Sequence, residues 1–305
     1  MIEGAARRAL EEAAGDAVRF EVPMSRFTSL RVGGPVEAMV TPGDRDELAR
    51  VLRVCALHRL PHAVIGNGFN SIVRDEGLAG VALRLSRLRD LGTRPGERLR
   101  SEAGVSHRQI TRFCQEQGLA GLEFGAGIPG TVGGWITMNA GIGQREVKDM
   151  VCEIEVMSPT RARIRHLGRQ LLHFGYRALR GLAPGSVILS ALFKVRVSTR
   201  TEVKAEVDRL LAERARRQPL DLPSCGSVFK NPPGGFAGQL IEAAGLKGER
   251  VGGAEISTTH ANFIVNRGGA TATDVISLIA KARALVRCRT GIVLEPEVRI
   301  LGRGA

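Results

Sequence analysis

The sequence is poor in several features that define common classes of protein. Its 305 residues include five cysteines, and no two of them form a C-x-x-C pair. The six histidines are also spread without a spacing typical of metal ligands. This pattern fits reduced thiols better than a disulfide framework or a zinc site, so we expect no metal.

The chain also lacks a long apolar segment. No stretch approaches the roughly 18 consecutive apolar residues that a transmembrane helix needs. The first residues, MIEGAARRALEEAAGDAV, mix acidic and basic side chains and have no apolar centre, unlike a secretory signal. We therefore expect a cytoplasmic protein without membrane insertion.

Aromatic residues are scarce at 4%, whereas basic residues outnumber acidic ones and give a formal net charge of +13. Nucleic-acid binding would explain this charge, but the basic residues are spread over the whole length and no known nucleic-acid motif is present. An enzyme for anionic ligands would also explain it, because positive clefts speed the capture of phosphates and carboxylates. Solvated surface charge is the plainest explanation and stays open. We expect no nucleic-acid partner.

Glycine is concentrated in one stretch, GLEFGAGIPGTVGGWITMNAG, which spans residues 121–141. The backbone must turn several times there. Its segment 127–134 presents backbone N–H groups with almost no side chain over them, which suits a phosphate or pyrophosphate. A buried turn that packs backbone against backbone has the same composition, so composition alone does not decide between the two.

A second glycine-rich loop, GNGFN at residues 66–70, follows a predicted short strand at 62–65. It is not the G-x-G-x-x-G motif, and residues 72–85 have the pattern of extended segments broken by Gly77 and Gly80. A Rossmann dinucleotide fold is therefore not expected. Taken alone, this loop is explained most simply as a tight turn.

Apolar spacing and capping signals predict helices and strands along the whole chain. Helices are expected at 3–14, 44–58, 106–118, 201–217, 236–244 and from Thr271 through Val286. Strands are expected within 20–40 and at 62–65, 151–157, 162–167, 187–197, 261–265 and 297–301. The character of the sequence changes near residue 198, where we place the main domain boundary.

Towards the C-terminus several long motifs occur together. They are PSCGSVFKN, FAGQLIEAAGLKG, HANFIVN and LEPEVRILG, preceded upstream by TSLRVGGP, GNGFN, GLEFGAGIPGTVGG and MNAG. In this order they resemble the UDP-N-acetylenolpyruvoylglucosamine reductase family, flavoenzymes that make UDP-N-acetylmuramate for peptidoglycan. The resemblance covers about residues 25–302.

The resemblance implies an α+β fold. A two-subdomain FAD-binding module of the vanillyl-alcohol-oxidase-like type, at 1–85 and 86–197, would precede a C-terminal α/β substrate domain at 198–305. The last strand of that domain would return to the active site. FAD would be the cofactor and NADPH the co-substrate, with the FAD pyrophosphate on the two glycine loops. The FAD-binding residues so implied are Gly66, Asn67, Gly68, Phe69, Asn70, Gly127, Ile128, Pro129, Gly130, Thr131, Gly133, Gly134 and Asn139.

The implied reaction moves a hydride from NADPH through FAD to the terminal methylene carbon of UDP-N-acetylglucosamine enolpyruvate. Negative charge then builds on the substrate carboxylate as an enolate, which preorganised donors stabilise. By motif position those donors are Arg177 in FGYR and Glu297 in LEPEV, and Ser227 in CGSVF protonates the neighbouring carbon. Arginine can hold a carboxylate in two hydrogen bonds. A glutamate helps there only when it is protonated, which burial and like charge favour.

The resemblance also implies which residues meet the substrate. Asn231 and Arg217 are expected at the UDP phosphates, and Tyr176 beside the substrate. Tyr176 is the only tyrosine and fifty positions separate Arg177 from Ser227, so the inserted tyrosine-bearing lid of one branch of the family is absent. We expect a monomer of the shorter branch, acting in cell wall biogenesis and through it in cell shape and division.

Four positions depart from the family pattern. Asn67 and Phe69 interrupt the first flavin loop, Trp135 stands where a small residue is common, and Leu179 replaces a frequent serine. Phe69 is bulky, so either its ring points away from the pyrophosphate or the loop lies farther from it. Two other functions fit parts of the sequence: an oxidase of the wider flavin superfamily, against which PSCGSVFKN and LEPEV argue, and a basic binding module without catalysis.

Overall fold

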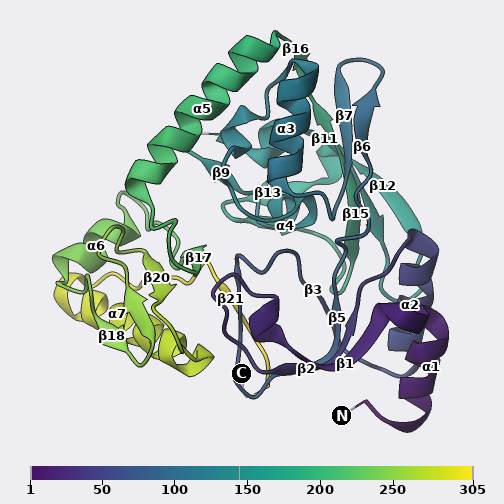
Figure 1. The fold of residues 1–305 in the computed structure, drawn as a ribbon, viewed down its shortest axis with the longest axis horizontal. Helices are drawn as coiled ribbons and strands as arrows, with labels where there is room; N and C mark the ends of the chain where they lie inside the picture. The colour runs from purple at the N-terminus through teal and green to yellow at the C-terminus, as the bar shows by residue number, and fades with distance from the viewer. Residues whose placement is uncertain (1, 144, 304–305) are drawn as a thin grey trace. The chain divides into compact units, whose positions relative to one another are not determined.

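The computed structural model describes residues 2–143 and 145–303. The chain forms two compact units built from interleaved segments (Figure 1). The first unit contains the N-terminal segment up to Phe20 together with Ala38–Gly66 and Gly80–Arg214. The second contains Glu21–Glu37, Asn67–Ala79 and the chain from Ala215 onward. The chain therefore passes between the units several times.

Two helices near the N-terminus pack against each other in the first unit. α1 (Gly4–Ala14) and α2 (Arg45–Leu57) confirm the helices predicted at 3–14 and 44–58. α2 begins after Asp44, whose side chain accepts a hydrogen bond of 2.8 Å from the backbone of Glu47. Nearby is a four-stranded sheet with the order β1, β2, β5, β3. Its strands are β1 (Val18–Pro23), β2 (Pro35–Val40), β5 (Leu78–Leu83) and β3 (His62–Val64).

The centre of the first unit is a five-stranded antiparallel sheet with the order β12, β11, β15, β7, β6. Its strands are β12 (Ile164–Gly168), β11 (Val151–Met157), β15 (Val187–Lys194), β7 (Arg98–Glu102) and β6 (Leu91–Arg94). α3 (His107–Gln117) has the predicted capping box of Ser106 and Gln109 and ends at Gly118, which has a φ of 62°. α4 (Val132–Thr137) packs on β15 and β7. This helix lies inside the stretch that the sequence predicted as loop.

Shorter pieces complete the first unit. They are β8 (Leu119–Ala120), β9 (Gly141–Ile142), β10 (Arg145–Glu146), β13 (His173–Gly175), β14 (Ala178–Arg180) and β16 (Arg196–Val197). The strand predicted at 187–197 is thus divided into β15 and β16. The charged helix α5 (Arg200–Arg217) follows, and Val203 and Val207 on it are buried with Ala120 and Ala126.

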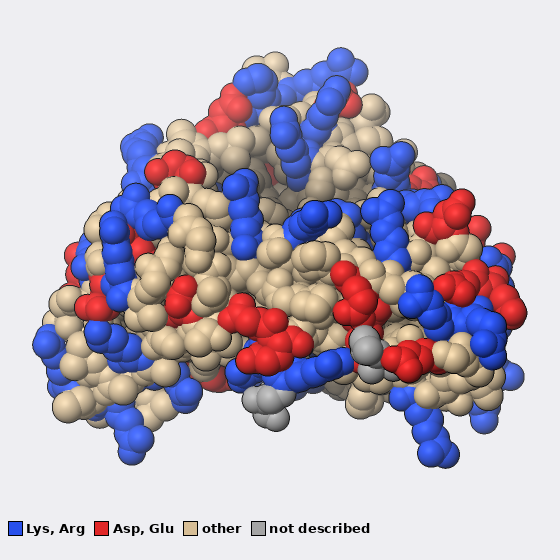
Figure 2. Space-filling view, turned by 60° about the horizontal axis from the view of Figure 1, so that its bottom comes forward, with Lys and Arg blue, Asp and Glu red and all other residues tan. Residues whose placement is uncertain are grey.

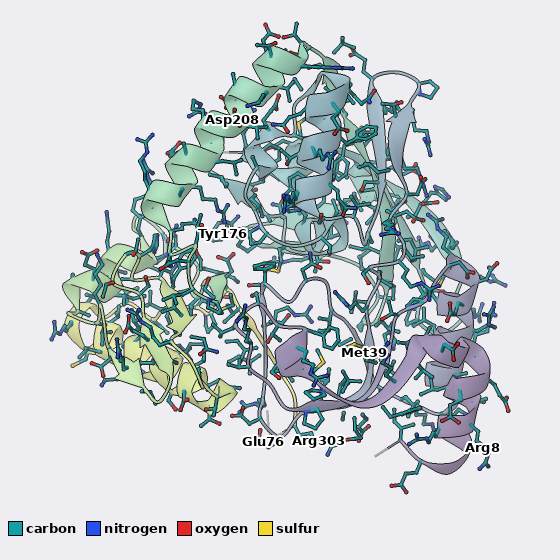
Figure 3. All side chains as sticks on the ribbon, viewed as in Figure 1. Arg8, Met39, Glu76, Tyr176, Asp208 and Arg303 are labelled. Atoms are coloured by element: carbon teal, nitrogen blue, oxygen red, sulfur yellow. The ribbon has the colours of Figure 1, made fainter. Side chains whose placement is uncertain are left out.

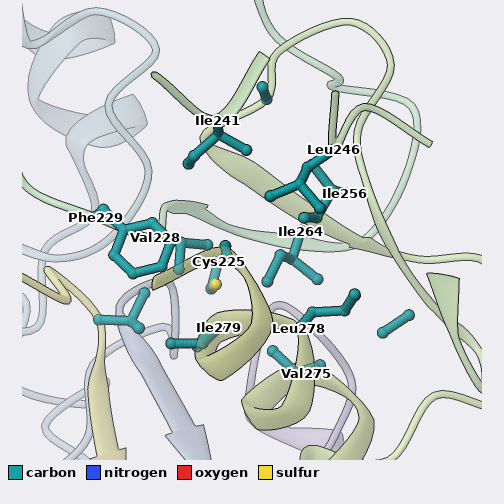
Figure 4. Close-up of a cluster of buried hydrophobic side chains, with 14 of the residues drawn as sticks. Cys225, Val228, Phe229, Ile241, Leu246, Ile256, Ile264, Val275, Leu278 and Ile279 are labelled. Atoms are coloured by element: carbon teal, nitrogen blue, oxygen red, sulfur yellow. The ribbon is translucent and has the colours of Figure 1, made fainter. Parts of the chain in front are cut away.

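The second unit contains a four-stranded antiparallel sheet covered by two helices. The strand order is β17 (Ser224–Ser227), β20 (Phe263–Asn266), β19 (Ala254–Ile256), β18 (Arg250–Val251). α6 (Ala237–Ala243) and α7 (Ala272–Thr290) pack with this sheet around one apolar core, in which Phe229, Ile264 and Leu278 are almost fully buried (Figure 4). The capping box of Thr271 and Asp274 is present as predicted.

The end of the chain returns to the second unit's early segment. β21 (Arg299–Leu301) pairs in parallel with β4 (Ser71–Val73), which directly follows the first glycine loop. Asp75 then accepts hydrogen bonds from the backbone of Ala272 (2.9 Å) and Thr273 (2.8 Å) at the start of α7. Segments separated by about two hundred positions are therefore joined in one unit.

Two features are absent from residues 2–143 and 145–303. No helix there has both the length and the apolar character that a membrane crossing requires. No group of His, Cys, Asp and Glu side chains in that part of the chain is arranged to hold a metal ion. The face in Figure 2 shows basic side chains interspersed with acidic ones.

Candidate functional site

The two glycine-rich loops meet in the first unit. A Cβ placed on Gly66, at the start of the first loop, would lie 2.7 Å from Oγ1 of Thr131 in the second. A side chain at this position would therefore displace the hydroxyl of Thr131, and glycine permits the close approach. The structure therefore brings together two segments that lie 65 positions apart in the sequence.

The second loop turns sharply before α4 begins. Gly127 and Gly130 have φ values of 75° and 120°, which favour glycine. A Cβ on Gly127 would lie 2.8 Å from Cδ of Arg214, so α5 covers this turn closely. Gly133 and Gly134 belong to α4, and Gly133 packs against Ala103.

Some amide groups of this segment are already used by the protein. The amides of Val132 and Gly133 donate to the carbonyls of Val105 and Ala103 at 2.9 and 3.0 Å, and that of Ile128 donates to Gly125. Among the described residues, no protein group accepts a hydrogen bond from the amide of Gly127. The donors left for a ligand are therefore fewer than the composition of 127–134 predicts.

Two side chains next to this turn have buried polar atoms without partners among the described residues. Nδ1 of His107 lies 2.7 Å from the carbonyl oxygen of Ile128, and since a carbonyl only accepts, Nδ1 carries the proton. Burial lowers the pKa of His107 to about 4, so its ring is neutral at pH 7. Nε2 of His107 and Nε of Arg214 are both buried and have no hydrogen-bond partner in the described part of the chain.

Arg214 carries a positive charge into this environment. Burial lowers the pKa of its guanidinium to about 10, which still leaves it charged at pH 7. Within residues 2–143 and 145–303 no carboxylate forms an ion pair with it. A cation that is largely buried without an anion is costly, so the position suits a negatively charged ligand.

Trp135, one of the departures from the family pattern, lies in the core. Its side chain is 2% exposed, and its ring contacts those of His107, Phe124 and Phe193. Its indole N–H donates to the carbonyl of Ala140 at 2.8 Å. The large side chain of Trp135 thus packs in the core and does not lie over the loop. Another departure, Leu179, also packs on this core, and Phe69 in the first loop is half-buried.

The rest of the first loop belongs to the second unit. A Cβ on Gly68 would lie 2.2 Å from the carbonyl oxygen of Phe27, so only glycine fits there. The hydroxyl of Ser29 lies 3.0 Å from the carbonyl oxygen of Gly68 and 2.7 Å from that of Ser224. Ser29 therefore ties the loop to the strand that carries Ser227.

Ser227 and Glu297 come from neighbouring segments of the second unit. The amide of Glu297 donates to the carbonyl of Val228 at 2.8 Å, and Asn70 of the first loop donates from Nδ2 to the carbonyl of Glu297 at 3.2 Å. The hydroxyl of Ser227 has no hydrogen-bond partner among the residues that the structure describes. Two of the three predicted catalytic residues and part of the flavin loop are thus brought together.

The CGSVF segment is held by a side chain rather than by a regular strand ladder. β17 changes register between Ser224 and Ser227, and Asn262 donates to the carbonyl of Phe229 (2.8 Å) and accepts from its amide (2.9 Å). Burial, followed by the charge of Glu297, raises the pKa of the Cys225 thiol to about 12. Cys225 is therefore a neutral packing residue.

Arg177 lies in the first unit, in the two-residue turn between β13 and β14. Its φ is 54°, a left-handed conformation that arginine rarely adopts. Nη2 lies 3.5 Å from the carbonyl oxygen of Gly141, and Nη1 lies 3.8 Å from Oε1 of Glu146. The guanidinium carbon is 5.0 Å from the ring centre of Tyr176, which is labelled in Figure 3.

Asn139 is completely buried and its amide is used by the protein. Nδ2 donates to Oε2 of Glu146 (2.8 Å) and to the carbonyl of Gly175 (2.9 Å), and Oδ1 accepts from the backbone of Lys148 (3.1 Å). These bonds leave no obvious donor for a cofactor.

The predicted substrate contacts lie at the edges of helices. Asn231 accepts a hydrogen bond of 3.1 Å from the backbone of Ala237, at the start of α6. Arg217 is exposed at the end of α5. Their role at the UDP phosphates stays a prediction.

Three residues of this region, His107, Arg214 and Glu146, were not predicted from the sequence. For Arg214 a signal existed, because it follows Val207 and Leu210 at helical spacing and so falls on the apolar face of α5. A basic residue on an apolar stripe is unusual and points to a partner. For His107 and Glu146 no pattern in the sequence separates them from ordinary surface residues.

Comparisons with known proteins cover nearly the whole chain. Residues 36–168 match the family model described as FAD binding domain, and residues 218–301 match the C-terminal domain of UDP-N-acetylenolpyruvoylglucosamine reductase. The reductase of that name from Geobacter metallireducens is 45% identical over 95% of this chain and 96% of its own length. The one from Streptococcus thermophilus is 41% identical over 96% of this chain and 95% of its own length.

Solved structures agree with these matches. The crystal structure of UDP-N-acetylenolpyruvylglucosamine reductase from Thermus caldophilus has a TM-score of 0.81 and 33% identity, over 93% of this chain and 99% of its own. The glucose dehydrogenase Phl p 4.0202 has a TM-score of 0.50 at 12% identity, over 65% of this chain and 45% of its own. The second likeness concerns the fold alone.

Proposed function

The chain belongs to the UDP-N-acetylenolpyruvoylglucosamine reductase family, and from this premise we propose that it reduces UDP-N-acetylglucosamine enolpyruvate to UDP-N-acetylmuramate. The observation that carries the proposal is the 45% identity over 95% of the chain. The family resemblance, the α+β fold class and the FAD-dependent oxidoreductase activity that the motifs predicted are confirmed by these matches.

The residues around the second glycine loop fit FAD. The amide of Gly127 has no acceptor among the described residues, Gly66 and Thr131 are in close contact, and Arg214 supplies a positive charge that no carboxylate in that part of the chain pairs with. We propose that these groups hold the negatively charged pyrophosphate or another electron-rich part of the cofactor. When bound, FAD supplies hydride transfer between NADPH and the substrate.

The chain's own task is to control charge on the substrate. Addition of hydride to the methylene carbon of the enolpyruvyl group places negative charge on the carboxylate as an enolate. Arg177 would hold that carboxylate by its guanidinium, and Glu297, when protonated, would donate a second hydrogen bond to it. Ser227 would give its hydroxyl proton to the adjacent carbon, which completes the lactyl ether.

Support for Ser227 comes from its surroundings. Its hydroxyl has no partner in the described part of the chain, while the backbone directly after it, at Val228 and Phe229, is held by Glu297 and by Asn262. A donor that is fixed in place but not already bonded is suited to proton transfer.

The remaining predictions belong to this proposal. Arg217, Asn231 and Tyr176 would contact the UDP-sugar, and the chain would act as a cytoplasmic monomer in cell wall biogenesis, affecting cell shape and division. The division into domains at residues 85 and 197 stays a prediction; α5 starts at Arg200, close to the second of these positions. No observation favours nucleic-acid binding over this function.

The proposal is tested by the visible absorption spectrum of the purified protein loaded with FAD, under anaerobic conditions. NADPH is expected to bleach the flavin absorption, and UDP-N-acetylglucosamine enolpyruvate is then expected to restore it with formation of UDP-N-acetylmuramate. Bleached flavin that the enolpyruvyl substrate leaves unchanged, but that oxygen reoxidises in the presence of a sugar, would support an oxidase instead.

A further inference from the structure

A polar cluster of Asn139, Glu146 and Lys148 lies next to Arg177 in the first unit. Its centre is Asn139, which is 0% exposed and has a φ of 42°, so its backbone adopts a left-handed conformation. Asparagine tolerates this conformation better than most residues. A fully buried asparagine in the left-handed conformation, with its side-chain nitrogen and oxygen both hydrogen-bonded, is held in one position by the surrounding structure.

The bonds of Asn139 connect two segments that meet at Arg177. One bond reaches the carbonyl of Gly175, two positions before Arg177 in the same hairpin. Another reaches the carboxylate of Glu146, which is itself 3.8 Å from the guanidinium of Arg177. Asn139 therefore fixes both the backbone turn that carries Arg177 and the anion that faces its side chain.

Glu146 contacts two cations of the cluster. Its carboxylate pairs with Nζ of Lys148 at 2.5 Å and lies 3.8 Å from Nη1 of Arg177. The carboxylate thus orients the guanidinium, whose planar fork can hold the carboxylate of a ligand in two hydrogen bonds.

We propose that Asn139 and Glu146 are positioning residues, which hold the guanidinium of Arg177 for the carboxylate of the substrate. The inference rests on the role of Arg177 in the proposed function. It differs from the motif-based expectation for Asn139, which placed that residue in direct contact with FAD.

The test uses the FAD-loaded enzyme with Asn139→Gly and Glu146→Gln. Glycine keeps the left-handed backbone and removes the side-chain bonds, and the unchanged affinity for FAD expected below reports that the variant is folded. Four quantities are measured: the Kd for FAD, the Kd for UDP-N-acetylglucosamine enolpyruvate on the oxidised enzyme, the rate of reduction by NADPH, and the rate of reoxidation by the substrate. Glu116→Gln, at an exposed pair with Arg112 on α3, is the matched control.

We expect the Kd for FAD and the reduction rate to stay within about threefold of the parent. Substrate affinity falls and reoxidation slows by about 100-fold in Asn139→Gly, because a small misplacement of a positioning group costs about that much. In an Arg177→Lys background, Asn139→Gly is expected to slow reoxidation by less than about a further threefold, because both substitutions damage the same interaction.

If Arg177→Lys slows reoxidation, two results would contradict the positioning role of Asn139 and Glu146 while leaving the proposed function intact. One is a weaker Kd for FAD with normal reoxidation, which would make Asn139 a cofactor contact. The other is an equal further loss in the Arg177→Lys background, which would make the cluster a general structural element. If Arg177→Lys itself leaves reoxidation unchanged, the catalytic role of Arg177 fails first and the inference with it.

Discussion

Side chains around the CGSVF segment divide into those that hold the backbone and those with chemistry to offer. Asn262 uses both ends of its amide on Phe229, and Cys225 is kept neutral by burial. Ser227 has a hydroxyl without a partner among the described residues. The neighbouring Glu297 is joined to the segment through its backbone, whose amide donates to the carbonyl of Val228.

Glu297 can be tested by comparing two substitutions. Glu297→Gln keeps a hydrogen-bond donor for the substrate carboxylate, whereas Glu297→Ala removes it. We therefore expect a milder loss of substrate-dependent flavin reoxidation for the glutamine variant, by about tenfold, which corresponds to one hydrogen bond of about 1.4 kcal/mol. Stopped-flow rates measure this. Equal losses in the two variants would mean that the proton of the carboxyl group itself is required.

Arg214 makes a second prediction about a single side chain. Arg214→Met keeps most of the side-chain volume over Gly127 but removes the charge. We expect FAD affinity to fall about 10- to 100-fold, the worth of a hydrogen bond to a charged group. The FAD-free protein should unfold at the same or a higher temperature, because an unpaired buried charge has been removed.

Arg216→Met, on the same helix but exposed, serves as the control for Arg214→Met. Fluorescence titration with FAD and thermal unfolding of the apoprotein provide the two readings. Unchanged FAD affinity in Arg214→Met would show that the charge of Arg214 does not contribute to binding of the cofactor.

Single residues were predictable from the sequence only through motifs. Ser227 and Glu297 lie in long motifs, and the structure places them in adjacent segments of one unit. Asn139 was also selected by its motif, but its bonds to Glu146 and Gly175 could not be foreseen, because they depend on how a hairpin 36 positions away folds back. Local patterns do not contain that information.

At the scale of elements, an ionic cluster joins α2 to the five-stranded sheet. Glu155 on β11 is bonded by Arg45 of α2 at 2.9 Å, by Arg100 of β7 at 2.5 Å and by the hydroxyl of Ser190 on β15. Burial opposes ionisation of this carboxyl, but the hydrogen bonds from Arg45, Ser190 and Arg100 outweigh it and lower the pKa of Glu155 to about 2. The charged form of Glu155 therefore stabilises the fold.

This lowered pKa predicts a pH dependence of stability. The contribution of Glu155 is fully present above its unfolded pKa of 4.5 and is lost as the pH falls through about 2. Glu155→Gln should cost about 1–2 kcal/mol of the free energy of unfolding at pH 7, since Arg45 and Arg100 are 25% and 22% exposed and partly screened. The gap between parent and variant should shrink as the pH approaches 2.

Urea unfolding at a series of pH values measures this gap. Glu153→Gln, on the same strand but paired with the exposed His166, controls for the general effect of losing a carboxylate. A gap that is constant from pH 7 to pH 2 would contradict the account of Glu155.

Elements with strong local signals were predicted correctly, and those set by packing were not. The capping boxes at Ser106 and Thr271 and the helices that follow them are confirmed. α4 was read as loop because its sequence VGGWIT contains two glycines, which disfavour a helix. Burial of Trp135 and Ile136 against the sheet overrides that preference. The gap between β15 and β16 likewise has no local signal.

For the whole molecule, the fold class was predictable but the path of the chain was not. A division near residue 198 was predicted from the change in composition; α5 begins two positions later, but its residues up to Arg214 belong to the first unit. The interleaving of segments, such as the pairing of β21 with β4, depends on contacts across more than 200 positions. Only the family resemblance predicted that the last strand folds back onto an earlier part of the chain, and its place at the active site stays a prediction.

The most direct measurement of the central claim separates the two half-reactions in Ser227→Ala. Stopped-flow absorption follows flavin reduction by NADPH and then reoxidation by UDP-N-acetylglucosamine enolpyruvate, with Ser224→Ala on the same strand as the control. We predict normal reduction in both variants and reoxidation slowed by about 10²- to 10⁴-fold in Ser227→Ala only, because only this step needs the proton donor. Reoxidation at the parent rate in Ser227→Ala would contradict the account.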